Sequence, residues 1–180
     1  MEKIGILLAL IACALPAQPQ GNASGIIYGP DWAYLIAAPD GFKMDNHALR
    51  RQGIWGLFYK RDQPKYLADA LNMYINPVKK GGEFPADLES LIAWDIAFFK
   101  ERNPSLAVKY YKDFELGDMG LCKAYSFDDE SSQYYMLYGY ATKTNASFVF
   151  VLIARSREER AENEVAYEEL LKSFVYLDKE

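Results

Sequence analysis

The chain has 180 residues, of which 51% are hydrophobic and 15% aromatic, and its formal net charge is −5. This composition excludes a disordered tail and a fibre, and it predicts a folded domain with a sizeable core. A modestly acidic chain without a basic stripe also argues against nucleic acid as a partner.

The first 17 residues have the layout of an export signal. Glu2 and Lys3 precede an apolar stretch over residues 4–15, which is too short to span a bilayer as a mature helix. We therefore expect the working domain in the periplasm or outside the cell. We assign residues 1–17 to the signal, 18–29 to a polar linker and 30–180 to one globular domain.

Two processing routes fit the end of this signal. Leu10-Ile11-Ala12-Cys13 matches the bacterial lipobox, in which the cysteine is acylated, so Cys13 would anchor the protein to a membrane. Cleavage at that point leaves a signal shorter than the usual range of about 15–30 residues. A cut by ordinary signal peptidase after Ala17 fits as well and gives a soluble product. A lipid anchor is the only membrane attachment that we expect.

Cysteine and histidine are scarce. Cys122 is the only cysteine after the signal, which excludes an intramolecular disulfide and a cysteine-rich metal site, and its apolar strand predicts a buried, unreactive thiol. The only histidine, His47, lies in a polar connecting segment, where it is either a surface residue or part of a site. The sequence contains none of the common hydrolase or metal-binding motifs. We therefore predict no catalytic residues, no metal and no cofactor.

Strands and helices alternate in blocks along the chain. Alternating apolar residues predict strands over residues 32–38, 54–59 and 71–75, and Asn76-Pro77 is expected to end the third. A helical period follows over residues 85–102, where the apolar stripe consists of Leu88, Leu91, Ile92, Phe98 and Phe99.

The second half of the chain returns to strands. These are predicted over residues 106–114, 120–127, 133–142 and 147–154, followed by a helix over residues 157–174. Residues 148–154 are apolar on both faces, so this strand should lie centrally in a sheet that is covered on both sides. We therefore predict an α+β fold in which helices flank a mostly antiparallel sheet of about six strands, an α/β/α sandwich.

The order of the predicted elements is that of a known group of proteins. A turn at residues 38–46 is followed by strands at residues 53–59 and 72–75 and then by the helix that contains Asp95. This order resembles small exported bacterial proteins with a PsbP-like fold, over nearly all of the mature chain. PsbP is a binding or assembly subunit of a photosynthetic complex. The resemblance implies the fold and, for function, binding rather than catalysis, but no functional residue of PsbP can be matched here.

Asp95 and a row of tyrosines are the candidate site residues. Asp95 interrupts the apolar stripe of its helix, so it needs either a hydrogen-bonding partner on the sheet or a ligand in a cleft between helix and sheet. The tyrosines on one strand face either pack beneath a helix or bind a sugar, an aromatic ligand or a protein. The candidate ligand-binding residues are Asp95, His47, Tyr134, Tyr138 and Tyr140.

Two classes of function stay open on this basis. We favour a non-catalytic binding or assembly protein of the bacterial cell envelope, because a complete hydrophobic pattern accompanies no catalytic motif. Its partner would be an envelope protein or a small ligand. The alternative is an envelope hydrolase or a small-ligand-binding protein whose cleft contains Asp95 and tyrosines.

Overall fold

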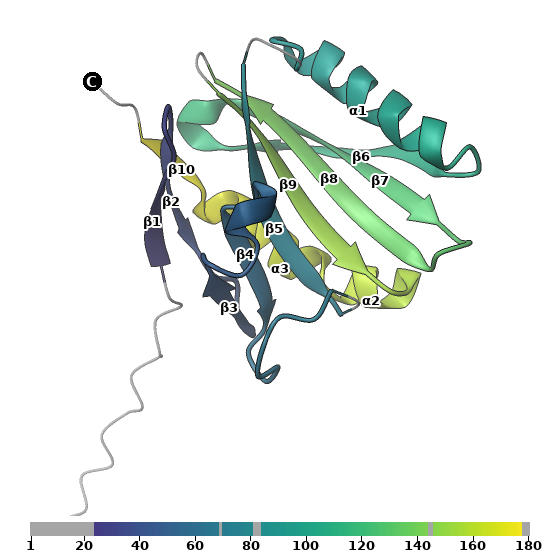
Figure 1. The fold of residues 1–180 in the computed structure, drawn as a ribbon, viewed down its shortest axis with the longest axis horizontal. Helices are drawn as coiled ribbons and strands as arrows, with labels where there is room; N and C mark the ends of the chain where they lie inside the picture. Colours follow the sequence, from purple (N-terminus) through teal and green to yellow (C-terminus); the bar gives the residue numbers. More distant parts are fainter. Residues whose placement is uncertain (1–23, 69, 81–83, 144–145, 178–180) are drawn as a thin grey trace, which may run out of the picture.

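The computed structural model describes residues 24–68, 70–80, 84–143 and 146–177 (Figure 1). The strands in these ranges are β1 (Ser24–Tyr28), β2 (Ala33–Ala37), β3 (Phe42–Asp45), β4 (Gly56–Lys60), β5 (Asn72–Lys79), β6 (Ala107–Glu115), β7 (Leu121–Asp129), β8 (Tyr134–Thr142), β9 (Ala146–Ala154) and β10 (Val175–Leu177). The helices are α1 (Leu88–Arg102), α2 (Arg157–Glu162) and α3 (Glu164–Ser173), with short 3-10 helices η1 (Arg50–Gln52) and η2 (Gly117–Met119).

The main sheet has seven antiparallel strands in the order β3-β4-β5-β9-β8-β7-β6. The chain runs from β5 through α1 to β6, which is an edge strand of the sheet. Hairpins then connect β6, β7, β8 and β9 in turn, and β9 pairs with β5. Helix α1 lies on one side of the sheet, and α2 and α3 lie on the other (Figure 1). The predicted α+β fold with helices on both faces is confirmed, although the main sheet has seven strands and not six.

A second sheet contains the strands β1, β2 and β10, again antiparallel. Strand β1 covers residues that we assigned to the polar linker 18–29, so that prediction is wrong over Ser24–Tyr28. Ile27, which is only 5% exposed, explains why this segment is ordered against the domain. The predicted export signal and Cys13 lie outside the described residues.

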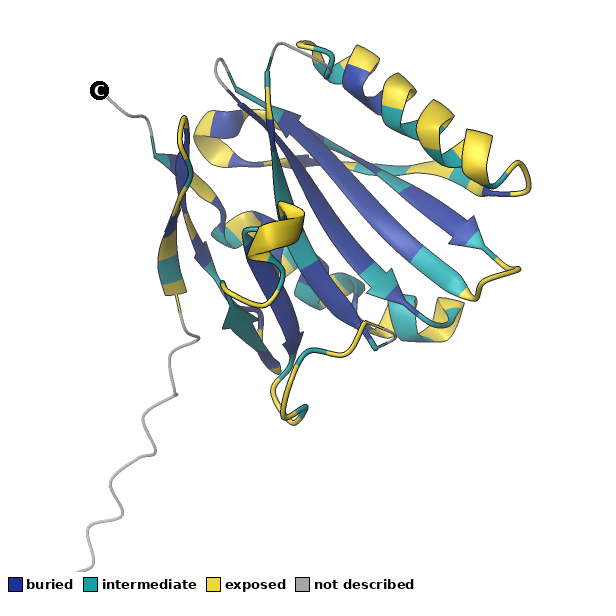
Figure 2. Ribbon diagram, viewed as in Figure 1, coloured by how far each residue is buried: buried dark blue, intermediate teal, exposed yellow. Residues whose placement is uncertain are grey.

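Strand β9 divides the hydrophobic core into two clusters. Phe148 and Phe150 face α3 and the small sheet, whereas Val149 and Val151 face α1. The strand is buried along nearly its whole length, as Figure 2 shows. The prediction of a central strand covered on both faces is therefore confirmed.

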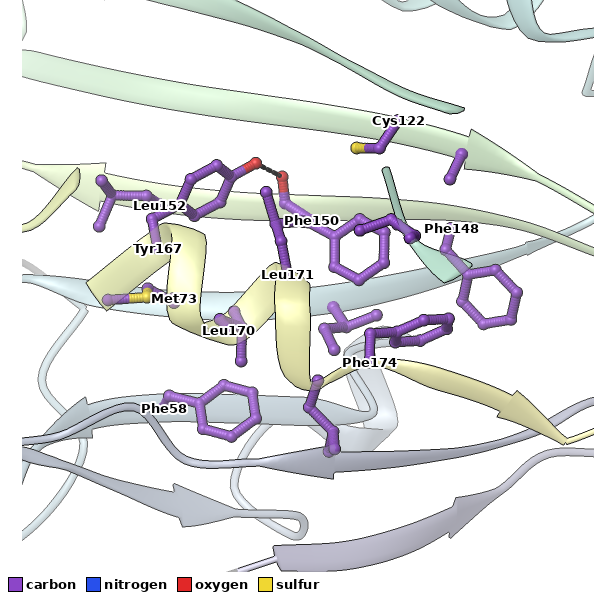
Figure 3. Close-up of a cluster of buried hydrophobic side chains, with 14 of the residues drawn as sticks. Phe58, Met73, Cys122, Phe148, Phe150, Leu152, Tyr167, Leu170, Leu171 and Phe174 are labelled. Atoms are coloured by element: carbon purple, nitrogen blue, oxygen red, sulfur yellow. Dashed lines mark hydrogen bonds between the residues drawn. The ribbon is translucent and has the colours of Figure 1, made fainter. Parts of the chain in front are cut away.

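The larger cluster lies between the main sheet, α3 and the small sheet (Figure 3). Tyr167 of α3 is fully buried there, and its hydroxyl donates a hydrogen bond to the Phe150 carbonyl oxygen at 3.0 Å. Cys122 is also fully buried, and burial raises the pKa of its thiol to about 12. The prediction that Cys122 is buried is confirmed, and the raised pKa agrees with an unreactive thiol.

The helix predicted over residues 157–174 is interrupted at Asn163. The Asn163 side chain donates to the Glu159 carbonyl oxygen at 2.7 Å, and the Asn163 backbone amide bonds Arg160 instead. A side chain that takes the carbonyl needed by the backbone ladder interrupts the helix, so α2 and α3 are separate elements.

Strand β5 continues through Pro77 to Lys79, beyond its predicted end. Pro77 lies opposite Phe148 of β9, whereas β4 pairs with β5 only as far as Ile75. The proline therefore stands where one side of β5 has no ladder partner, and a missing amide proton is tolerated there.

Candidate functional site

A cleft of about 460 Å³ lies between α1 and the seven-stranded sheet. Its walls are mainly aromatic and aliphatic, with one carboxylate and one amide side chain among them. The lining residues are Tyr74, Asn76, Val78, Phe84, Leu91, Trp94, Asp95, Phe98, Phe99, Tyr138, Val149 and Val151.

Helix α1 forms one wall of this cleft and is anchored near its beginning. The Asp87 side chain caps the helix by accepting a hydrogen bond from the Ser90 amide at 2.9 Å. Leu91 and Ile92 are the buried residues of the helix, and they hold its first half against the sheet. Further along, the Phe99 ring contacts other rings on β7 and β8. Most of the remaining helix surface is exposed, as Figure 2 shows.

Three aromatic side chains surround the mouth of the cleft. The rings of Trp94 and Phe98 stack with their centroids 5.5 Å apart, and Phe84 meets Trp94 edge-on at 5.1 Å. Trp94 and Phe98 are each 37% exposed. The prediction that Phe98 belongs to the buried stripe of the helix is therefore wrong, because the ring lies at the edge of the contact with the sheet.

Asp95 faces the sheet from the middle of α1. The Tyr140 hydroxyl donates to Asp95 Oδ2 at 2.7 Å, the one hydrogen bond that this carboxylate makes within the described residues. Burial raises the pKa of Asp95 above its usual value, and the hydrogen bond from Tyr140 lowers it by less. The expected partner on the sheet is thus a tyrosine hydroxyl. The carboxylate also lines the cleft, so its role toward a ligand stays a prediction.

A second polar pair lies beside this carboxylate. The Tyr74 and Tyr138 side chains line the cleft together with Asp95. Burial raises the pKa of Tyr74 to about 12 and that of Tyr138 well above its usual value. Both phenols therefore stay protonated near neutral pH, where they act as hydrogen-bonding groups and not as bases.

The predicted site residues do not converge on one pocket. Tyr138 lines the α1 cleft with Asp95, and Tyr140 bonds Asp95 from the sheet. Tyr134 lines a different pocket, of about 370 Å³, which includes Arg102 and Met136. His47 is exposed and lines a third pocket, of about 210 Å³, with Arg50 and Trp55. The Asp95 and His47 pockets share no lining residue.

Five aromatic residues of the cleft were not predicted as site residues, namely Tyr74, Phe84, Trp94, Phe98 and Phe99. A signal was present for two of them, since Trp94 and Phe98 are four residues apart and therefore adjacent on one helix face. In the described parts of the chain, no three histidine, cysteine or carboxylate side chains are grouped so that they could hold a metal ion.

The layered arrangement, with one long helix over an antiparallel meander and a cleft beneath it, defines the class: the chain has a PsbP-like α+β fold. No family model matches the sequence, and a search of curated proteins finds no match. Solved structures, in contrast, share its fold.

Three solved structures illustrate the class. The chain is similar to the cyanobacterial PsbP protein CyanoP of Synechocystis, with a TM-score of 0.56, 11% identity and coverage of 93% of this chain and 99% of CyanoP. It is similar to the Ran-binding protein Mog1p of Saccharomyces cerevisiae, with a TM-score of 0.54, 13% identity and coverage of 86% of this chain and 94% of Mog1p. It is also similar to LpqN, which is involved in cell envelope biogenesis of Mycobacterium tuberculosis. Here the TM-score is 0.53, the identity is 14%, and the match covers 87% of this chain and 91% of LpqN. At these identities the likeness shows the fold alone.

Proposed function

We propose that this protein is a non-catalytic binding protein of the bacterial cell envelope and that it binds a small, largely apolar ligand in the cleft beneath α1. The observation that carries this proposal is the cleft itself, which has aromatic walls and a volume of about 460 Å³. Clefts of this size, mostly apolar with a few convergent polar groups, are typical of small-molecule sites.

The chemistry of the cleft supports binding over hydrolysis. Its carboxylate accepts a hydrogen bond from the Tyr140 hydroxyl, and burial keeps the Tyr74 and Tyr138 phenols protonated by raising their pKa values. His47, the one histidine of the chain, lines another pocket, so Asp95 and His47 do not form an acid-base pair. The hydrolase alternative therefore gains no support from these two residues.

The envelope location is part of the proposal and rests on the amino-terminal pattern. The signal over residues 1–17 would deliver the domain either as a soluble periplasmic or secreted protein or as a lipoprotein anchored through Cys13. None of the helices in the described ranges has the length and apolar character that crossing a membrane requires. The likeness of LpqN, an envelope biogenesis protein, is compatible with this location.

The test is a titration with phenylnaphthylamine, a neutral aromatic probe that becomes fluorescent in apolar surroundings. The protein should bind the probe saturably, with one site per chain. Val149 lines the cleft from β9 and is 6% exposed, so Val149→Phe should fill the cleft and weaken probe binding at least about tenfold, or about 1.4 kcal/mol.

The matched control adds the same ring outside the cleft. Ala97 is exposed on α1 and does not line the cleft, so Ala97→Phe should bind the probe like the unmodified protein. Equal probe binding by a folded Val149→Phe variant would contradict the proposal, because the probe would then bind elsewhere.

A further inference from the structure

We infer that the cleft selects ligands in which a protonated amine is attached to an apolar or aromatic body. This inference rests on the proposed function and specifies the chemical class of its ligand. Asp95 is the group that would receive the amine, and the aromatic rings around it would hold the body.

The charges of the residues that line the cleft favour a cation, and the nearby Arg102 guanidinium lies over the Phe98 ring without lining the cleft. Asp95 is the one carboxylate among the described lining residues, and none of those residues is basic. An anionic ligand would place a second negative charge beside a half-buried carboxylate with no cation to balance it. A cationic ligand would instead supply the counter-ion that the protein itself does not provide in this cleft.

The hydrogen bonds at Asp95 leave room for a donor. A carboxylate has about four acceptor sites, and Tyr140 uses one of them, at Oδ2. Asp95 is half-buried and lines the cleft, so the carboxylate borders the space that a ligand would occupy. An ammonium group carries three donors, one for Asp95 and two for other oxygens of the cleft lining, which includes Tyr74 and Asn76.

The aromatic walls suit the same ligand. Trp94, Phe98 and Phe99 come from α1, and Tyr138 faces them from β8. A cation within about 6 Å of an aromatic ring centroid is stabilised by the electrons of the ring face. The same rings bury an apolar body, and the stacked Trp94 and Phe98 at the mouth would cover its outer end.

The experiment compares three phenylbutyl compounds that differ only in their head group: phenylbutylamine, phenylbutanol and phenylbutanoate. Each competes with phenylnaphthylamine at pH 7.5 and low salt. We expect the amine to displace the probe at least about tenfold more strongly than the alcohol, and the carboxylate to be the weakest. In Asp95→Asn the affinity of the amine should fall to that of the alcohol, while the affinity of the alcohol changes less than about threefold.

The outcomes separate this inference from the proposed function. Displacement by the alcohol equal to that by the amine in the unmodified protein would overturn the inference. The cleft would still be a binding site as long as Val149→Phe weakens probe binding. This comparison requires no substitution of Asp95, so it is decisive even where Asp95→Asn fails to fold. An undiminished preference for the amine in a folded Asp95→Asn variant would also overturn it.

Discussion

The two faces of the seven-stranded sheet are both apolar, yet they are covered in different ways. On one face, Phe148 and Phe150 are fully buried beneath α3 and the small sheet, and Tyr167 of α3 is fully buried against them. On the other face, α1 buries Leu91 and Ile92 and leaves a cleft of about 460 Å³ beside them. A single strand, β9, supplies side chains to both. An apolar face thus does not by itself determine how closely a helix packs upon it.

The difference follows from what each helix places against the sheet. Gly139 on β8 leaves space for the Tyr167 ring, whose hydroxyl bonds the Phe150 carbonyl, so α3 closes its face with a satisfied polar group. Helix α1 places Asp95 at its centre, opposite Tyr140 and Tyr138. The Asp95–Tyr140 pair therefore lies at the border of a cleft, whereas the Tyr167 hydroxyl is enclosed in a packed core. We therefore expect the α3 face to contribute most of the stability, and the proposed ligand site lies on the α1 face.

The sharpest test of this comparison removes one phenylalanine ring from each face. Phe150→Ala should cost about 3–5 kcal/mol of unfolding free energy, because a fully buried ring leaves a cavity. Phe98→Ala should cost less than about 1 kcal/mol, because that ring is 37% exposed, but it should weaken probe binding in the cleft. Urea unfolding measures both costs. Equal losses of stability would mean that the two faces contribute alike.

A smaller effect is expected from filling the space beside Tyr167. A Cβ atom at Gly139 would lie 2.7 Å from Tyr167 Oη and 2.9 Å from Cys122 Sγ. Gly139→Ala should therefore displace the tyrosine and destabilise the protein by about 1–3 kcal/mol in urea unfolding. Ala93→Gly, on the exposed side of α1, is the control for a change of one methyl group and should cost about 1 kcal/mol through helix propensity alone. An unchanged midpoint in Gly139→Ala would show that the α3 face is not tightly packed.

Much of the main sheet could be predicted because its signals are local. The hairpins from β6 to β9 consist of long alternating segments, so their pattern is readable without knowledge of the rest of the fold. Strands β1, β3 and β10 were missed, and they have five, four and three residues. Strand β10 forms by pairing with β2, about 140 positions earlier in the chain. No local pattern encodes such a pairing.

The site was predictable to the extent that its residues violate a pattern. Asp95 is conspicuous because a charge interrupts an apolar stripe, and Tyr138 and Tyr140 follow from alternation along one strand. The sequence does not show that Tyr134 and His47 lie in other pockets, because this depends on how the elements are arranged in space. Trp94 and Phe98 were missed for a related reason: the distance between a helix and a sheet decides whether a ring at the edge of the helix is covered.

The smallest effect concerns the charge of Asp95. It tests whether this charge on α1 lowers the stability of the folded protein. Burial raises the pKa of this carboxyl in the folded protein, so the folded state holds the proton more tightly than the unfolded state does. Stability from this group is then full below the ordinary aspartate pKa and declines as the pH rises through the raised value. The groups facing it, Tyr140 and Tyr138 from β8 and Tyr74 from β5, have raised pKa values and stay neutral in that range.

Asp95→Asn keeps the shape and an acceptor for Tyr140 without the charge. In urea unfolding from pH 4 to pH 7, the unmodified protein should therefore lose stability relative to Asp95→Asn as the pH rises. A difference that grows in the opposite direction would mean that the folded protein favours the charged carboxylate, and that the α1 face is better suited to a buried charge than its apolar walls indicate.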